Sequence, residues 1–278
     1  MQASSWVPEE IDPNTPSPAR VYDVHLGGSH NFAADRELAR KAAEAMPELP
    51  ALLRANRSFL RRAVRFLVGA GIRQFLDLGS GIPTVGNVHS IAEAANPECR
   101  VAYVDIDPVA VAHSRLMLRN NPRAVAVQAD LRDPDTVLEN PTVTGLLDFS
   151  RPIALLAVAV LHFVPDVDRP ADILAHYIRA LPADSYVVLS HATVGNENPD
   201  QVQEAADLYA SSIPGFTLRG RDQVAGFVAG LDLVEPGLVY LGNWRPDPTE
   251  TDTEPSTLPG YGAVGIKRAA QTSTLADS

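Results

Sequence analysis

Short apolar runs that end in glycine or aspartate recur along the chain, separated by segments in which apolar residues return every three or four positions. The clearest run covers 72–78 and leads into the turn at Gly79 and Gly81. Similar runs cover 101–104, 124–129, 152–161 and 186–192. Strands that are apolar on both faces are typical of a parallel sheet covered by helices on each side. The pattern therefore predicts an α/β fold of the doubly wound type.

Helical periodicity predicts helices over 33–46, 54–70, 87–95, 171–181, 198–212 and 221–230. A sixth strand is expected over 238–241, followed by a polar loop over 246–259 and a last strand over 261–268. Because only a loop separates these two strands, we expect them to pair antiparallel. Four regions follow: a disordered N-terminus over 1–17, a helical lid or cap over 18–53, the main domain over 54–268 and a flexible tail over 269–278.

The composition fits one large globular core and limits the possible partners. The chain has 278 residues, of which 45% are hydrophobic, and no apolar run reaches the ~18 to 20 residues of a membrane span. The first residues lack the basic start and apolar centre of a signal peptide, so we expect a cytoplasmic protein. A net charge of −11 opposes binding to nucleic acid. The single cysteine, Cys99, has no neighbours with metal-ligand spacing, so no metal site is expected.

The glycine turn and the acidic residues after the second strand indicate a nucleotide-like ligand. Glycines at 79 and 81 allow the backbone to approach such a ligand closely, although a tight turn without a ligand is the alternative. Asp105 lies at the end of the second strand, where a carboxylate accepts hydrogen bonds from ribose. Asp107 precedes Pro108 and an apolar-periodic segment, and is interpreted as a helix N-cap.

Polar residues also follow the next three strands. Asp130 can accept a hydrogen bond from an adenine amine while the N–H of Leu131 meets a ring nitrogen. His162 and His191 follow the fourth and fifth strands and are the candidate catalytic residues. For both histidines, a structural role with satisfied hydrogen bonds is an equal alternative.

The N-terminal segment combines polar side chains with a glycine hinge. Tyr22, His25 and Asn31 flank Gly27 and Gly28, as in a lid that folds over a ligand, although a packing arm with a glycine hinge is the alternative. Five arginines decorate the predicted helix over 54–70, and most are expected to form a solvated face. Arg57 is the one expected to face inward and pair with a ligand carboxylate.

Taken together, these features resemble class I S-adenosylmethionine (SAM) dependent methyltransferases. The sequence is most similar to the mostly actinobacterial S-adenosyl methyltransferase family, over about residues 17–268, in seven stretches: 18–23 (PARVYD), 27–28 (GG), 31–36 (NFAADR), 54–57 (RANR), 74–84 (QFLDLGSGIPT), 128–134 (QADLRDP) and 161–166 (LHFVPD).

The resemblance implies a Rossmann-like fold with a seven-stranded, mostly parallel sheet in the order 3-2-1-4-5-7-6, the last strand being antiparallel. It also implies SAM as the cofactor and does not identify the methyl acceptor. Pro83 falls where many methyltransferases have a third glycine, so the usual contacts to the methionine portion do not all carry over. The predicted cofactor-binding residues are Tyr22, Asn31, Arg57, Asp77, Gly79, Ser80, Gly81, Asp105, Ile106, Asp130, Leu131 and His162.

Three functions compete at this point. The first is a SAM-dependent methyltransferase that acts on a small molecule, mainly by proximity and orientation. The second is a non-catalytic SAM-binding or regulatory protein, because no obligatory base can be named. The third is a nicotinamide-dinucleotide oxidoreductase, which fits less well because Thr84 occupies the third glycine position of the dinucleotide fingerprint.

Overall fold

The computed structural model describes residues 12–83, 86–195, 198–247 and 257–269, so Thr84 and most of the expected disordered N-terminus and flexible tail lie outside the described residues. Within these ranges an eight-stranded sheet forms the centre of the molecule, in the order β3-β2-β1-β4-β5-β8-β6, with β7 also paired to β8. The strands are β1 (Gln74–Leu78), β2 (Arg100–Asp105), β3 (Ala124–Gln128), β4 (Ala154–Val158), β5 (Ser185–Ala192), β6 (Asp232–Leu233), β7 (Val239–Tyr240) and β8 (Gly260–Lys267).

The strand order confirms the predicted mostly parallel sheet with an antiparallel last strand. β1 to β5 run parallel to their neighbours, whereas β8 pairs antiparallel with β5, β6 and β7. The expected sixth strand over 238–241 is shorter than predicted, because only Val239 and Tyr240 pair there. A second short strand, β6, precedes β7 in the chain and pairs with Gly265 and Ile266 of β8. It raises the number of strands from seven to eight.

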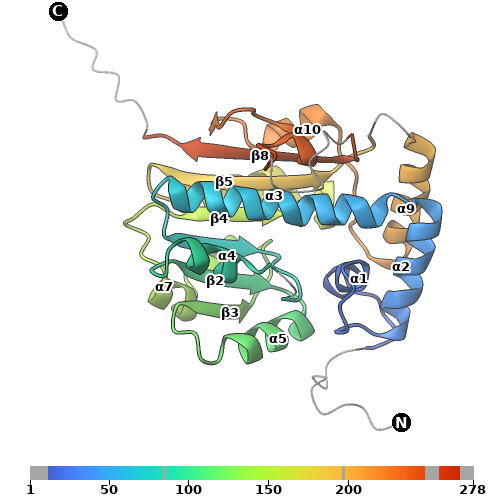
Figure 1. Cartoon of the computed structure of the whole chain (residues 1–278), viewed down its shortest axis with the longest axis horizontal. Helices are drawn as coiled ribbons and strands as arrows, with labels where there is room; N and C mark the ends of the chain where they lie inside the picture. The colour runs from blue at the N-terminus through green and yellow to red at the C-terminus, as the bar shows by residue number, and fades with distance from the viewer. Residues whose placement is uncertain (1–11, 84–85, 196–197, 248–256, 270–278) are drawn as a thin grey trace, which may run out of the picture.

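Alternate residues of the central strands pack into two separate apolar layers. Phe75 of β1 packs with residues of α3 and α4, while Leu76 packs with residues of α8 and α10 on the opposite face. Every residue of β1 is buried, as expected for a parallel strand covered on both faces. The sheet is thus the middle layer of three (Figure 1).

Seven of the ten α-helices in the described part of the chain have proline in the first turn, where its fixed φ and missing N–H cost nothing. The helices are α1 (Pro18–His25), α2 (Ala33–Ala45), α3 (Leu49–Gly69), α4 (Val88–Ala95), α5 (Pro108–Leu118), α6 (Pro134–Leu138), α7 (Pro141–Leu146), α8 (Pro170–Ala180), α9 (Pro199–Ser212) and α10 (Arg221–Phe227). Three short 3-10 helices are η1 (Leu161–Phe163), η2 (Asp166–Asp168) and η3 (Leu241–Asn243).

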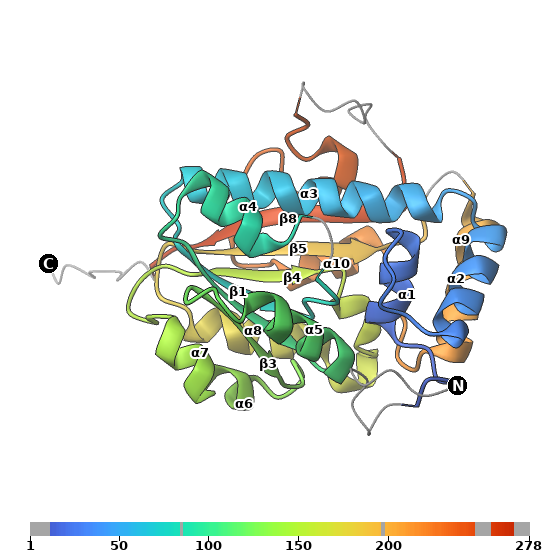
Figure 2. The same ribbon diagram turned by 60° about the horizontal axis from the view of Figure 1, so that its bottom comes forward.

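The N-terminal helices lie beyond the carboxyl ends of the parallel strands. Figures 1 and 2 show α1 next to this edge of the sheet, with α2 and α9 side by side further out. α3 begins at Leu49, five residues before the predicted start of the long helix, since Pro50 is tolerated in its first turn. The segment predicted as a cap therefore consists of α1, α2 and the first turn of α3, and it covers the edge of the sheet where ligands bind in such folds.

Candidate functional site

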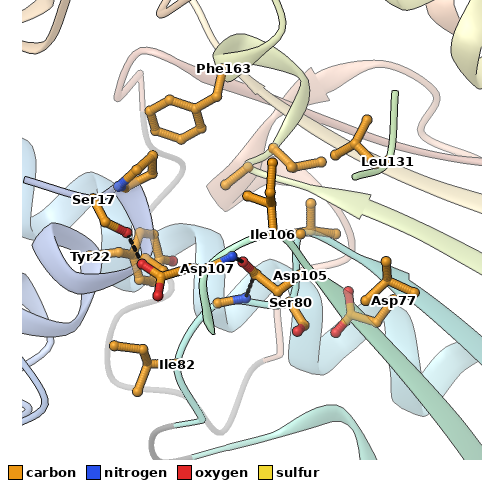
Figure 3. Close-up of a pocket in the computed structure, with 18 of the residues that line it drawn as sticks. Ser17, Tyr22, Asp77, Ser80, Ile82, Asp105, Ile106, Asp107, Leu131 and Phe163 are labelled. Atoms are coloured by element: carbon orange, nitrogen blue, oxygen red, sulfur yellow. Dashed lines mark hydrogen bonds between the residues drawn. The ribbon is translucent and has the colours of Figure 1, made fainter. Parts of the chain in front are cut away.

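A cavity of about 310 Å³ opens at the carboxyl edge of the sheet, between the strand ends and α1 (Figure 3). Ten of the twelve predicted cofactor residues line it: Tyr22, Arg57, Asp77, Gly79, Ser80, Gly81, Asp105, Ile106, Asp130 and Leu131. They come from the cap, from α3 and from the ends of β1, β2 and β3. The fold thus brings together residues that are more than a hundred positions apart in the sequence.

The glycine turn after β1 has two glycines with positive φ, and each serves a different purpose. Gly79 has φ +65° and packs so closely against Val160 that a Cβ there would collide with the valine side chain. Gly81 has φ +67°, and a Cβ there would meet no atom within 4 Å. Gly81 therefore leaves an open approach from the cavity to the backbone, as a ligand lying against the turn requires.

Asp105 connects this turn to the end of β2. Its Oδ2 accepts a hydrogen bond from the Gly81 N–H at 2.6 Å, and its Oδ1 accepts one from the Asp107 N–H at 2.8 Å (Figure 3). Burial raises the pKa of Asp105 to about 6. Each carboxylate oxygen offers two lone pairs, so Asp105 can accept further hydrogen bonds from a ligand in the cavity.

Asp107 caps α5, which confirms the interpretation made from its position before Pro108. Its Oδ1 accepts hydrogen bonds from the N–H groups of Val109 at 2.7 Å and Ala110 at 3.4 Å. The two aspartates at the end of β2 therefore have separate tasks: Asp105 holds the glycine turn, and Asp107 holds the helix that follows.

Asp77 presents a buried carboxyl to the cavity. Only 6% of the residue is exposed, and no group in the described ranges donates a hydrogen bond to its carboxylate. Burial raises the pKa of Asp77 to about 7, an effect that the nearby charge of Arg57 opposes and that of Asp105 reinforces. Arg57 itself donates from Nη2 to the carbonyl oxygen of Gly86 at 2.8 Å. A cationic ligand group would meet an available carboxylate at Asp77.

Asp130 and Leu131 follow β3 and also line the cavity. Arg132 donates from Nη2 to Asp130 at 2.6 Å and from Nη1 to Asp168 at 3.0 Å. Burial raises the pKa of Asp130, but the hydrogen bonds from Arg132 outweigh it and lower the pKa below the ordinary value. The backbone N–H of Leu131 has no acceptor in the part of the chain described, so it can donate to a ligand.

Three predicted candidates do not reach the cavity. Asn31 donates from its amide to Asp23 at 2.9 Å and to the carbonyl oxygen of Gly28 at 3.1 Å, so it shapes the glycine hinge instead of lining the site. His162 and His191 are 7% and 2% exposed, and their rings contact each other at a centroid distance of 5.3 Å.

His162 does not stand at the end of β4, because that strand ends at Val158, earlier than the apolar run predicts. His191 lies within β5, as expected. The chain turns at Ala159, with φ 54°, and enters η1, which carries the His162 ring into the protein. His191 Nε2 contacts Arg219 Nη1 at 3.0 Å, and burial lowers the pKa of His191 to about 4. Both rings are buried, and neither lines the cavity.

A buried ion-pair network that the sequence analysis missed fastens the cap to the site. Arg20 of α1 pairs with Asp35 of α2 at 2.9 Å and with Asp107 at 3.5 Å. The Ser17 hydroxyl donates to Asp107 (Figure 3), and the Ser17 backbone N–H donates to Asp35 at 3.0 Å. Arg20 is 4% exposed and Asp35 is completely buried. Nothing local distinguishes these residues from surface charges, because their partners come from distant positions.

Two other classes of site find no support among the residues that the structure describes. These residues contain no group of three or more histidine, cysteine or acidic side chains arranged to hold a metal ion. Within the same ranges, no helix is both long and apolar enough to cross a membrane.

Solved structures with the same architecture include two that are clearly related to this chain. A protein of the DUF574 family from Streptomyces avermitilis is 39% identical and has a TM-score of 0.86, over 92% of this chain and 99% of that one. A putative methyltransferase from Thermobifida fusca is also 39% identical, with a TM-score of 0.88 over 96% of this chain and 100% of that one. An O-methyltransferase family protein from Burkholderia thailandensis, 13% identical with a TM-score of 0.55 over 93% of this chain and 66% of that one, shares the fold.

No curated protein matches the sequence. The model of the family described as S-adenosyl methyltransferase matches residues 4–268, which is nearly the whole chain. The cofactor of this protein is therefore SAM, and its activity is that of a SAM-dependent methyltransferase. The chain belongs to the S-adenosyl methyltransferase family.

Proposed function

We propose that the cavity at the carboxyl edge of the sheet holds SAM and that the protein methylates a small-molecule acceptor there. The observation that carries this proposal is the carboxylate of Asp105, which is buried, fixed by the Gly81 N–H and still able to accept hydrogen bonds in the cavity. A carboxylate at the end of the second strand, beside a glycine turn, is the usual partner of ribose hydroxyls.

The other lining residues provide complementary groups for the rest of the cofactor. We assign the adenine end to Asp130 and Leu131, which offer a carboxylate for the exocyclic amine and a backbone N–H for a ring nitrogen. Ile106 is 58% exposed at the cavity wall and gives an adenine ring an apolar surface. We assign the methionine end to Asp77 and Arg57, whose opposite charges match the ammonium and the carboxylate of an amino acid.

We propose that the residues around the cavity act mainly by binding and orienting the reactants. When bound, SAM supplies a methyl group on a positively charged sulfur, a leaving group that departs without protonation. His162 and His191 do not line the cavity, so proximity and orientation are the main contributions of the protein. The net charge of −11 disfavours a nucleic-acid substrate and supports a small acceptor.

We also propose that the cap over 18–53 acts as a lid that excludes water from the site. Tyr22 lines the cavity, and Gly27, with φ +77°, allows the chain to reverse after α1. The network of Arg20, Asp35 and Asp107 joins the lid to the end of β2 next to the ribose position. Excluding water strengthens electrostatic interactions around a charged cofactor.

Calorimetric titration of the purified protein with SAM, S-adenosylhomocysteine and NAD tests the proposed function. We expect both sulfur-containing ligands to bind with one site per chain, and NAD to show no saturable binding at the same concentrations. Binding of NAD in preference to SAM, or no binding of either sulfur compound, would refute the assignment of the cavity. A metabolite screen for methyl transfer then identifies acceptors.

A further inference from the structure

A chain of hydrogen bonds with a fixed direction includes two side chains of the cavity lining, those of Asn56 and Tyr22. The Ala159 N–H donates to Ser190 Oγ at 2.9 Å, and that hydroxyl donates to Asn56 Oδ1 at 2.6 Å. Asn56 Nδ2 donates to the Tyr22 hydroxyl oxygen at 3.0 Å, and the Tyr22 hydroxyl donates to the carbonyl oxygen of Leu53 at 3.2 Å. The chain links β4, β5, α3 and α1.

This direction determines what Tyr22 can offer to a ligand. A hydroxyl has one proton and two lone pairs. The proton of Tyr22 is engaged by Leu53, and one lone pair is engaged by Asn56. The remaining lone pair can only accept, so a second molecule in the cavity must bring a donor, such as a hydroxyl or an N–H group, to meet it. A carboxylate or ether oxygen at this position would face the lone pair unfavourably.

The cavity lining also contains apolar residues to which no cofactor group is assigned. Besides Tyr22 and Asn56, the lining includes Leu60, Phe163, Ile213 and Pro214. The ring of Phe163 is held by Phe216 at a centroid distance of 5.5 Å, and Figure 3 shows Phe163 at the border of the cavity. Such a surface favours an apolar molecular body.

Charged groups of the lining have partners or belong to the cofactor end. Asp107 is paired with Arg20, and Asp130 with Arg132. Arg57 and Asp77 carry opposite charges that influence each other. A charged acceptor next to Tyr22, Asn56 and the apolar residues would lose its hydration without gaining a counterion, which is unfavourable in a buried site.

We propose that the methyl acceptor is an uncharged, mainly apolar small molecule whose hydroxyl or N–H group donates a hydrogen bond to Tyr22. This inference rests on the proposed function and reassigns Tyr22 from the cofactor to the acceptor. Methylation forms a bond from the acceptor's oxygen or nitrogen to the methyl carbon and breaks the carbon–sulfur bond. The electron pair of that bond stays on sulfur, and the acceptor's proton is released to solvent when the lid opens.

The test uses the full-length protein saturated with S-adenosylhomocysteine and a fragment panel observed by ligand NMR. Each ring skeleton in the panel is present with a hydroxyl, a carboxylate, an ammonium group or no polar group. We expect the hydroxyl fragments to bind best and to lose about fivefold or more in affinity in Tyr22→Phe, which removes one hydrogen bond. Fragments without a polar group should bind equally to the wild type and to Tyr22→Phe. Tyr186→Phe, near the start of β5 and outside the cavity lining, is the matched control and should not change fragment binding.

A second variant separates occupancy of this region from effects on folding. Pro214 is exposed and lines the cavity, so Pro214→Trp narrows it without disturbing the core and should abolish fragment binding while leaving S-adenosylhomocysteine affinity intact. Preference for carboxylate or ammonium fragments, an unchanged hydroxyl preference in Tyr22→Phe, or no fragment binding at all would overturn the inference. Failure to bind S-adenosylhomocysteine would instead refute the proposed function, so the two failures are distinguishable.

Discussion

Asp77→Asn is expected to change protein stability and cofactor affinity in opposite directions. The pKa of Asp77 is about 7 in the folded protein, against an ordinary value of 3.8, because the carboxyl is buried. The folded state therefore binds this proton more tightly than the unfolded chain does. The stability that the proton contributes is complete below about pH 4 and is lost as the pH rises through 7.

The size of this effect follows from the two pKa values. At about 1.36 kcal/mol per pKa unit, the ionised Asp77 costs the ligand-free protein up to about 4 kcal/mol at pH 8. Asparagine cannot ionise, so Asp77→Asn should raise the free energy of unfolding at pH 8 by a large part of that amount and leave it almost unchanged at pH 4. The variant also lacks the negative charge that we assign to the cofactor's ammonium group, so its affinity for SAM at pH 8 should fall more than tenfold.

Urea unfolding between pH 4 and pH 8, with and without SAM, measures both effects. The exposed Asp200→Asn is the matched control and should change neither quantity. Wild-type affinity for SAM should rise between pH 6 and pH 8 as Asp77 ionises, and this rise should shrink in Asp77→Asn. If the variant were less stable than wild type at pH 8 without ligand, or bound SAM equally well, our assignment of a buried, ligand-directed carboxylate would be refuted.

Three further variants test other parts of the site. Asp105→Ala should weaken SAM binding more than tenfold, because a hydrogen bond to a charged group contributes ~1.5 to 3 kcal/mol; unchanged affinity in calorimetry would mean that the ribose lies elsewhere. Asp130→Ala should weaken the binding of adenine-containing ligands. In that variant, removing the amine from the adenine should weaken binding little further; if removing the amine weakened binding equally in wild type and variant, the adenine assignment would be wrong. Arg20→Met should destabilise the protein by about 3 to 5 kcal/mol and increase hydrogen exchange over 18–35, since it leaves buried carboxylates unpaired. Arg40→Met removes an exposed ion pair and should change stability little; equal effects of the two variants would show that the network does not fasten the cap.

The central sheet and the glycine turn beside the cavity could be predicted from local sequence because their determinants are local. Apolar runs that end in glycine or aspartate mark strands buried on both faces. The order of Asp105, Asp107 and Pro108 separates the carboxylate that holds the glycine turn from the carboxylate that caps α5. The turn at Gly79 and Gly81 was identified for the same reason, since positive φ values strongly favour glycine.

Features that depend on distant contacts could not be predicted in this way. The apolar run over 152–161 gives no sign that β4 ends at Val158, so His162 was expected at the cavity and is instead buried beside it. Asn31 was misplaced because its amide bonds to Asp23, a contact with no sequence signature. Arg20 and Asp35 resemble ordinary helix charges until the fold brings them together.

A crystal structure of the protein with S-adenosylhomocysteine is the most direct test of the account. We predict that the ligand lies in the cavity against the Gly79 and Gly81 turn, with its ribose hydroxyls on Asp105, its adenine next to the Leu131 N–H and its amino group facing Asp77. Binding outside this cavity, or in the reverse orientation with adenine at Asp77, would contradict the assignment of the site.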